Sequence, residues 1–153
     1  MASPLGEPRQ GCGGMMAVTL VCGPPAAGKT TWVEARAGPR ARIIDLDAIC
    51  RSLGSRSSHD HPRHIKRMAE QIRRSLENRA AGGDGETFVI RCLPNPADRE
   101  AAAERLGARV VVLAVPADEA LARAEADGRP EWTGQAIRDW WDRYEPSPVD
   151  DPH

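Results

Sequence analysis

Short apolar runs alternate with longer amphipathic or alanine-rich segments along this chain from residue 16 onward. Apolar runs bounded by glycine, proline or polar residues are typical of buried strands. The four runs are residues 16–22, 41–46, 86–93 and 109–115. Because helical segments separate them, the pattern predicts an α/β fold, a parallel central sheet of about four strands with helices on both faces.

The longest helix is predicted over residues 63–80, where apolar side chains recur at spacings of three and four. These side chains are Ile65, Met68, Ala69, Ile72 and Leu76. Shorter helices are predicted over residues 29–37, 96–106, 118–126 and 134–144. Asp47 is predicted to cap a further short helix that reaches about Leu53.

The two ends of the chain lack these patterns. Residues 1–14 are rich in glycine and proline and predict a disordered leader, so Met15 or Met16 could be the true start. Residues 147–153 predict a disordered tail. One domain, residues 15–146, is expected between them.

The composition is that of an ordinary globular domain. The 153 residues carry a formal net charge of −1, which gives no general attraction to nucleic acid or to a membrane surface. The four cysteines have no CxxC pair and no metal-ligand spacing, which favours reduced thiols and a cytoplasmic protein. No apolar run is long enough for a membrane span, and residues 1–14 do not resemble a signal peptide.

A glycine-containing segment with the spacing GxxxxGK[ST] joins the first predicted strand to the first predicted helix. This segment, the phosphate loop, consists of Gly23, Pro24, Pro25, Ala26, Ala27, Gly28, Lys29 and Thr30. Such a loop surrounds phosphates with backbone N–H groups and the positive end of a helix. Lys29 is predicted to reach the β- and γ-phosphates, Thr30 to ligate Mg²⁺, and Thr31 to contact the α-phosphate. The segment therefore predicts binding of a nucleoside triphosphate.

Two carboxylates, Asp45 and Asp47, lie at the end of the second predicted strand, at the edge of a parallel sheet where ligands bind. Side chains alternate along a strand, so both can face the same side. Asp45 could join the Mg²⁺ shell, and Asp47 could accept the proton of an attacking hydroxyl. The alternative is that neither carboxylate has a role in the chemistry, so that Asp47 only caps a helix and Asp45 is a solvated residue at the end of the strand.

The third predicted strand ends in Ile90-Arg91-Cys92 and carries no carboxylate. A hydrolytic P-loop ATPase typically has Asp-Glu there, and its Glu activates water. The absence of that pair from the sequence favours a kinase over a motor. Arg91 points to the same edge of the sheet and is predicted to bind a phosphate or another anionic group of the acceptor.

Arg123 and Arg129 lie in and beside a loop punctuated by glycine and proline, and residues 123–133 are predicted to form a mobile lid. Lid arginines can neutralise charge on the transferring phosphoryl group. The alternative is that both are ordinary solvated arginines. His59, His61 and His64 cluster in a polar segment, and their irregular spacing favours a solvated loop over a metal site.

These motifs resemble those of the polynucleotide-kinase-like group of P-loop kinases and of small AAA-family ATPases of phages and prophages. The resemblance spans residues 16–146 and rests on the phosphate loop, Asp45-Leu46-Asp47, Asn95-Pro96, Arg123 and Arg129. It implies that Asp47 is the general base on an acceptor hydroxyl and that the two arginines bind the donor phosphates. The chain departs from the group in two ways, because Arg91 stands where those kinases carry an Asp and because the lid is shorter.

The sequence thus predicts an ATP- and Mg²⁺-dependent phosphotransferase that acts on a hydroxyl of a nucleic-acid 5′ end or of a small molecule. Two alternatives stay open, an ATP-binding or ATP-hydrolysing accessory protein of phage or prophage DNA metabolism, and a small-molecule or nucleotide kinase. The sequence has no Asn/Thr-Lys-x-Asp motif for reading guanine, which favours ATP over GTP. Neither a membrane nor a stable protein partner is predicted.

Overall fold

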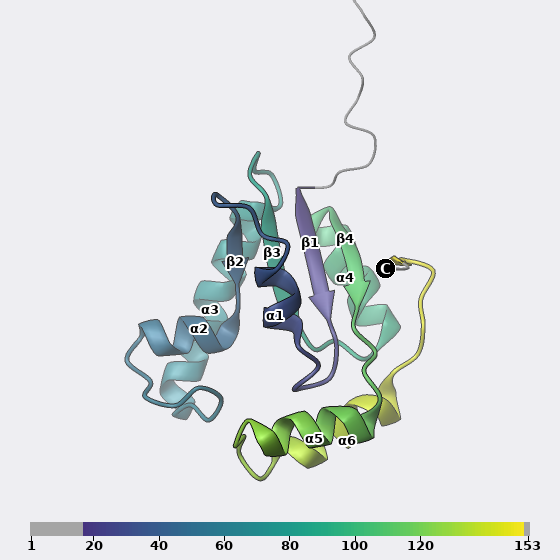
Figure 1. Ribbon diagram of the computed structural model, residues 1–153. Coiled ribbons are helices and arrows are strands. Elements are labelled where there is room, and N and C mark those ends of the chain that lie inside the picture. Colours follow the sequence, from purple (N-terminus) through teal and green to yellow (C-terminus); the bar gives the residue numbers. More distant parts are fainter. Residues whose placement is uncertain (1–16, 152–153) are drawn as a thin grey trace, which may run out of the picture.

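The computed structural model describes residues 17–151, so the predicted leader lies outside the described residues. Its centre is a parallel sheet of five strands in the order β2-β3-β1-β4-β5 (Figure 1). The strands are β1 (Val18–Cys22), β2 (Arg42–Ile44), β3 (Thr87–Arg91), β4 (Ala108–Val112) and β5 (Asp150–Asp151). The predicted α/β fold is confirmed, and the sheet has one short strand more than expected.

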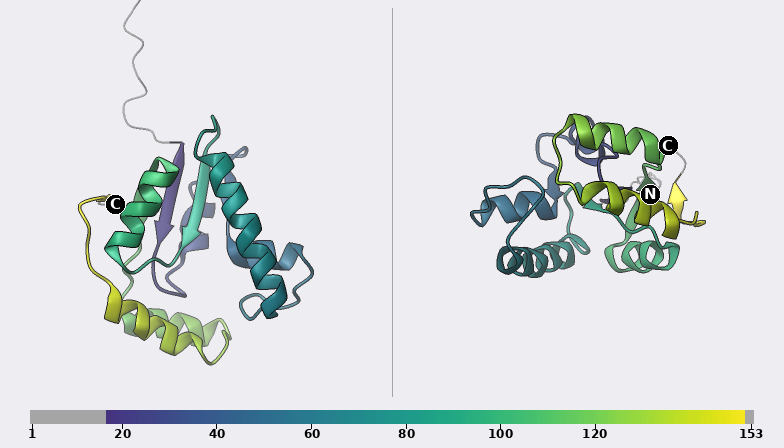
Figure 2. Two further views of the ribbon diagram at one scale, coloured as in Figure 1. Left: turned by 180° about the vertical axis from the view of Figure 1, so that it is seen from behind. Right: turned by 90° about the horizontal axis from the view of Figure 1, so that it is seen from below.

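Helices cover both faces of this sheet. α1 (Lys29–Glu34) lies on one face, whereas α3 (Arg63–Ala80) and α4 (Pro96–Leu106) lie on the other (Figures 1 and 2). α2 (Leu46–Ser52) follows β2, and α5 (Ala117–Ala126) and α6 (Thr133–Arg143) form a hairpin across the carboxyl ends of the strands (Figure 2). Within residues 17–151, no helix is long and apolar enough to cross a membrane.

The alternation of side chains along β1 divides the core into two layers. Leu20 and Cys22 are buried on the face that α3 and α4 cover, where Leu106 packs against them. Val21 points the other way and packs with Val33 of α1 and Ile90 of β3. A central strand buried on both faces has to be apolar throughout, which is why β1 appears in the sequence as a continuous apolar run.

Asp45, and not Asp47, is the N-cap of α2. The Oδ1 atom of Asp45 accepts a hydrogen bond from the backbone N–H of Asp47 at 3.4 Å. β2 ends at Ile44, so the predicted strand 41–46 was too long and the prediction of Asp47 as the cap was wrong. An N-cap side chain bonds to an amide two or three residues further on, and Asp47 therefore lies in the first turn of α2 with its carboxylate available for other contacts.

The prediction of a disordered tail was wrong for residues 147–151. Asp150 pairs in parallel with Val110 of β4, and its carboxylate accepts two hydrogen bonds, of 3.0 and 2.9 Å, from Arg99 of α4. Arg99 is fully buried and also donates to three backbone carbonyl groups, those of Leu93, Pro94 and Glu145. The segment thus neutralises a buried charge, a role that its polar sequence does not reveal.

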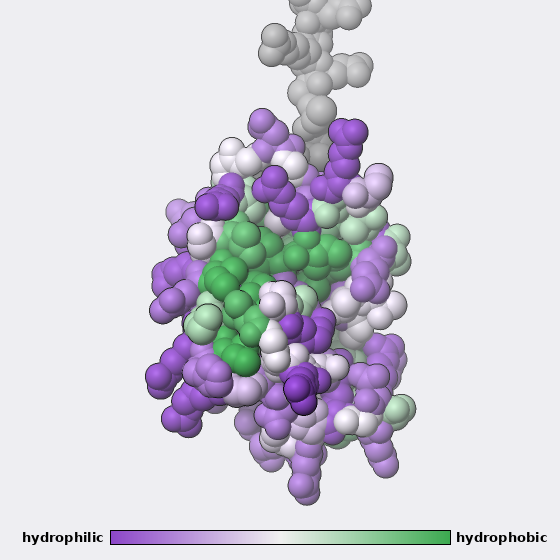
Figure 3. Space-filling model, turned by 90° about the vertical axis from the view of Figure 1, so that its left-hand side faces the viewer, coloured by the Kyte–Doolittle hydropathy of each residue, from purple (hydrophilic) through white to green (hydrophobic). Residues whose placement is uncertain are grey.

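The edge strand β2 carries an exposed apolar side chain. Figure 3 views this side of the molecule and shows apolar side chains gathered there. Ile43 of β2 is 42% exposed, and Arg42 beside it is also exposed. A charged side chain on an edge strand is a common protection against pairing with another chain.

Candidate functional site

The phosphate loop lies at the carboxyl edge of the sheet, between β1 and α1. Gly28 is the N-cap of α1 and has a φ of 83°, in the left-handed region that favours glycine. A Cβ atom on Gly23 would lie 2.8 Å from the carbonyl oxygen of Leu113, just after β4, so that position has no room for a side chain. The local backbone geometry therefore explains why the motif has glycine at both positions.

Lys29 bends over this loop. Its Nζ atom donates hydrogen bonds to the carbonyl oxygens of Gly23 at 2.7 Å and Pro24 at 2.9 Å. The same atom lies 3.6 Å from Sγ of Cys92, at the end of β3. The ammonium group thus occupies the space between the loop and β3, where its charge favours an anionic ligand.

A cleft of about 430 Å³ opens beside the loop and brings most of the predicted residues together. The predicted residues in its lining are Pro25, Ala26, Ala27, Gly28, Lys29, Thr30, Thr31, Asp45, Asp47, Arg91 and Arg129. They are far apart in the sequence, because they lie at or after the ends of β1, β2 and β3 or between α5 and α6. They meet because the carboxyl ends of parallel strands share one edge of the sheet.

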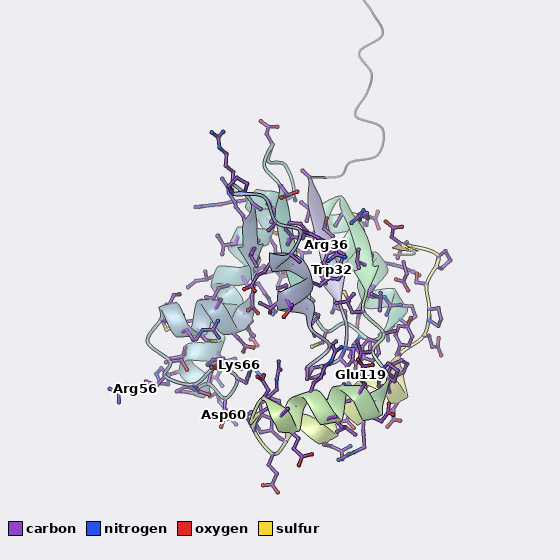
Figure 4. The ribbon with its side chains drawn as sticks, in the orientation of Figure 1. Trp32, Arg36, Arg56, Asp60, Lys66 and Glu119 are labelled. Atoms are coloured by element: carbon purple, nitrogen blue, oxygen red, sulfur yellow. The ribbon has the colours of Figure 1, made fainter. Side chains whose placement is uncertain are left out.

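A second cavity, of about 680 Å³, lies on the other side of the phosphate loop and shares Ala27, Gly28 and Thr31 with the cleft. Its lining includes Trp32, Val115 and Arg123. Trp32 projects from α1, and the guanidinium carbon of Arg36 lies 4.0 Å from the centroid of its ring (Figure 4). Among the described residues, the buried Nε1 atom of Trp32 has no hydrogen-bond partner. This largely apolar cavity suits a flat ring that offers an acceptor to that N–H group.

Both carboxylate oxygens of Asp47 contact histidines. Nδ1 of His59 lies 3.1 Å from Oδ2, and Nε2 of His61 lies 2.8 Å from Oδ1. The side chain of His61 is only 3% exposed, and its Nδ1 atom lies 2.7 Å from Oγ of Ser55. In the neutral ring, the tautomer that satisfies both contacts accepts from Ser55 at Nδ1 and donates to Asp47 from Nε2.

The prediction of a solvated loop was therefore wrong for His59 and His61, whereas His64 on α3 is exposed. The nearness of the three histidines to Asp47 in the sequence was a signal for this cluster. Their spacing alone could not show that the loop after α2 folds back onto the carboxylate.

Asp45 lies in an environment that disfavours its negative charge. Burial raises the pKa of Asp45, and the negative charge of Asp47 raises this pKa further. A cation would relieve this repulsion, and the oxygen donors of Asp45 and Thr30 fit Mg²⁺, which protein sites bind through one or two oxygens together with substrate phosphates. Within residues 17–151, no three His, Cys, Asp or Glu side chains gather into a metal site of their own.

Arg91 leaves the end of β3 and contacts a buried carboxylate. Its Nη1 atom donates to Oε1 of Glu77 at 3.2 Å. Arg73, one turn before Glu77 on α3, lies 3.9 Å from the same oxygen and also lines the cleft. The sequence analysis missed Arg73, because an arginine on the polar side of an amphipathic helix is ordinarily solvated.

The two predicted lid arginines lie on opposite sides of the phosphate loop. Arg123 of α5 donates from Nη1 to the carbonyl oxygen of Ala27 at 3.0 Å and from Nη2 to Glu119 at 2.7 Å. Arg129 lies in the turn after α5, lines the cleft and contacts Asp127 at 3.2 Å. The α5–α6 hairpin is thus docked on the loop through a direct hydrogen bond.

Two further residues at the start of α6 line the cleft and were not predicted. Trp132 is 51% exposed, although it is a large apolar side chain. The buried Oγ1 atom of Thr133 has no hydrogen-bond partner among the described residues. An exposed aromatic face and an unpaired hydroxyl in one cleft are features of a ligand site.

Comparison with known proteins decides the family. The family model AAA_33, described as an AAA domain, matches residues 18–146. The chain belongs to the AAA_33 family. The match extends from β1 through the end of α6, so it includes the phosphate loop and the whole cleft. Membership establishes a P-loop, kinase-like domain of the nucleotide-binding phosphotransferase type, whereas the polynucleotide-kinase group in particular stays a prediction.

Among curated proteins, no match to this AAA_33 chain was found. Among solved structures, it is similar to the tunicamycin resistance protein of Deinococcus radiodurans, with 18% sequence identity and a TM-score of 0.52. The similarity covers 82% of this chain and 78% of that protein. At this identity, the likeness concerns the fold alone.

Proposed function

We propose that this AAA_33 chain is an ATP- and Mg²⁺-dependent kinase that transfers the γ-phosphoryl group to an acceptor hydroxyl. The placement of Asp47 carries this proposal, because a carboxylate held by two histidines lines the same cleft as the phosphate loop. A hydrolytic motor would need an acidic residue near the end of β3 to activate water, and β3 ends at Arg91.

The donor nucleotide has a natural orientation in this site. Its phosphates lie on the phosphate loop, where Lys29, Arg123 and Arg129 stabilise their negative charge. Its base occupies the cavity beside Trp32, on the opposite side of the loop from Asp47. Thr30 and Asp45 would hold Mg²⁺, which neutralises charge on the β- and γ-phosphates when bound.

Asp47 acts on the acceptor. It orients the attacking hydroxyl and accepts its proton while the hydroxyl oxygen bonds to the γ-phosphorus. The bond from that phosphorus to the bridging oxygen breaks, and ADP leaves with the electron pair. Arg91 binds an anionic group of the acceptor and thereby places the hydroxyl.

The acceptor that becomes labelled would distinguish two other functions, polynucleotide kinase and accessory ATPase, from this proposal. A polynucleotide 5′ end would be labelled by a polynucleotide kinase, and an accessory ATPase of phage DNA metabolism would release phosphate without labelling any acceptor.

We place the reaction in the cytoplasm, because Cys22, Cys50 and Cys92 are free thiols.

Incubation with γ-labelled ATP and a panel of alcohols and 5′-hydroxyl oligonucleotides tests the proposal. We expect label on an acceptor, and Asp47→Asn should reduce its transfer about 100-fold or more with little change in ATP affinity. Asp60→Asn, an exposed carboxylate in the same loop as the histidines, is the matched control. Slow release of phosphate with no labelled acceptor would contradict the kinase activity.

The same assay tests the role of the phosphate loop. Lys29→Ala should weaken both ATP binding and turnover, because the ammonium group stabilises the phosphates in the bound and transition states. Lys66→Ala removes the other lysine of the chain and should leave both unchanged. Full activity of Lys29→Ala would overturn the assignment of the loop.

A further inference from the structure

Three arginines converge on one buried carboxylate behind the cleft. Glu77 of α3 is 1% exposed and contacts Arg105 at 2.7 Å, Arg91 at 3.2 Å and Arg73 at 3.9 Å. One carboxylate cannot neutralise three guanidinium groups. The cluster therefore holds surplus positive charge, which Glu70 on α3 offsets only in part at Arg73, since no ion pair joins the two side chains in the described part of the chain.

The surplus charge faces the cleft. Arg73 and Arg91 both line it, whereas Arg105 does not and instead donates to Asn78 on the surface. The two carboxylates of the cleft, Asp45 and Asp47, form no ion pair with either arginine in the described part of the chain. The surplus is thus left for a ligand.

Most of the hydrogen-bond donors of these two side chains are also unused. A guanidinium group has five N–H donors. Within residues 17–151, Arg91 donates one hydrogen bond, to Glu77, and Arg73 makes only the longer ion pair. Burial lowers the pKa of Arg73, and the positive charge of Arg91 lowers it further, so an anion between the two would stabilise both charges.

We propose that Arg73 and Arg91 bind a phosphate monoester of the acceptor, which makes the substrate a small alcohol that already carries one phosphate. This inference rests on the proposed kinase function and names the class of its acceptor. Two guanidinium groups match the two charges of a phosphate monoester and can engage its oxygens in paired hydrogen bonds.

The shape and charge of the chain favour a small acceptor over a polynucleotide. The cleft of about 430 Å³ is within the size range of small-molecule sites. Thr133 and Trp132 in its lining offer an unpaired hydroxyl and an exposed ring to the body of such a molecule. The net charge of −1 gives the chain no general attraction to the phosphate backbone of a polynucleotide.

Matched pairs of acceptors test this inference. Glycerol and glycerol phosphate, glucose and glucose 6-phosphate, a nucleoside and its monophosphate, and a 5′-hydroxyl oligonucleotide are each incubated with γ-labelled ATP and the full chain. We expect the phosphorylated member of at least one pair to be labelled at least tenfold more efficiently than its partner. Equal labelling of both members, or preferential labelling of the oligonucleotide, would overturn the inference while leaving the kinase function standing.

Substitution of the arginines adds the structural test. Arg73→Gln and Arg91→Gln should each raise the KM for the phosphorylated acceptor about tenfold or more, with the KM for ATP unchanged. Two arginines remain on Glu77 in each variant, so its carboxylate stays paired. Arg105→Gln removes the third guanidinium group from Glu77 outside the cleft and should leave both KM values within about twofold. An equal effect of all three substitutions would mean that the cluster is structural only.

A binding measurement separates failure of the inference from failure of the kinase function. Inorganic phosphate is titrated calorimetrically into the chain saturated with Mg²⁺ and a non-hydrolysable ATP analogue, which blocks the phosphate loop. Binding that weakens about tenfold in Arg73→Gln and Arg91→Gln, but not in Arg105→Gln, would establish the anion site even if no acceptor is labelled. Absence of phosphate binding to the wild-type chain would refute the site.

Discussion

The Nε2 atom of His61 lies 2.8 Å from Oδ1 of Asp47, although fourteen residues separate them in the sequence. His59 contacts the other carboxylate oxygen, and Ser55 holds the far side of the His61 ring. A carboxylate engaged at both oxygens has little freedom to rotate, so it can hold an acceptor hydroxyl in a reactive geometry. The loop after α2 thus positions the proposed general base.

His61→Ala should reduce kcat about tenfold with the KM for ATP unchanged, because Asp47 would keep its charge and lose its fixed orientation. Ser55→Ala removes only the hydroxyl group that selects the ring tautomer and should have a smaller effect in the same direction. Steady-state kinetics measures both. His64→Ala, at an exposed position on α3, should behave like the wild type. A wild-type kcat for His61→Ala would exclude this positioning role.

Arg123→Ala should raise the KM for ATP and lower kcat, each about tenfold, because Arg123 joins α5 to the carbonyl oxygen of Ala27 in the loop where we propose that the donor phosphates bind. Its other contact, Glu119, is an exposed partner one turn away on α5, and such pairs contribute only about 0.3–0.5 kcal/mol. Glu119→Ala should therefore change both constants less than twofold. Similar losses in the two variants would indicate that stability of α5, and not charge at the phosphates, explains the effect.

Asp45→Asn should preserve the stability of the fold, and the variant should need more Mg²⁺ for activity. Asparagine caps helices as well as aspartate does, and the raised pKa of Asp45 means that its ionisation costs stability at pH 7. The Tm of the variant at pH 7 should equal or exceed that of the wild type. Any gain in Tm should disappear once the pH falls below the ordinary pKa of Asp45, because the wild-type side chain is then protonated in both the folded and the unfolded state. The Mg²⁺ concentration for half-maximal activity should rise about tenfold or more. A lower Tm at pH 7, or unchanged dependence on Mg²⁺, would contradict the assignment.

Asp150→Ala should lower the free energy of unfolding by about 3–5 kcal/mol, because it leaves the buried Arg99 without its carboxylate. Urea denaturation measures the change. Arg109 and Asp151 form an exposed pair at 3.4 Å on the same pair of strands, so Arg109→Ala should cost less than about 1 kcal/mol. Equal costs for the two substitutions would mean that the contact with Arg99 does not stabilise the fold.

The order of the elements and the phosphate loop were predictable because their signals are local. The helix over residues 63–80 repeats apolar side chains at the helical period, and the structure has α3 at the same residues. Gly28 is required by its own backbone conformation, and Lys29 follows it directly as the first residue of α1. Such features depend on neighbours a few positions away, and a sequence displays those directly.

Three features could not be predicted in the same way. They are the partners of Asp47, the arginines around Glu77 and the pairing of the C-terminal segment with the sheet. His61 reaches Asp47 only because the loop after α2 folds back. Arg73 reaches the cleft only because α3 packs against one face of the sheet. In the sequence Asp150 is typical of a solvated tail, and only the structure shows that it accepts a hydrogen bond from the buried Arg99.

The sequence by itself determined an α/β domain with a phosphate loop, since periodicity and backbone conformation are properties of short segments. The tertiary structure decided which charges are buried and which side chains meet in the cleft. Those outcomes depend on contacts between segments far apart in the chain, and on the cost of burying a charge without a partner.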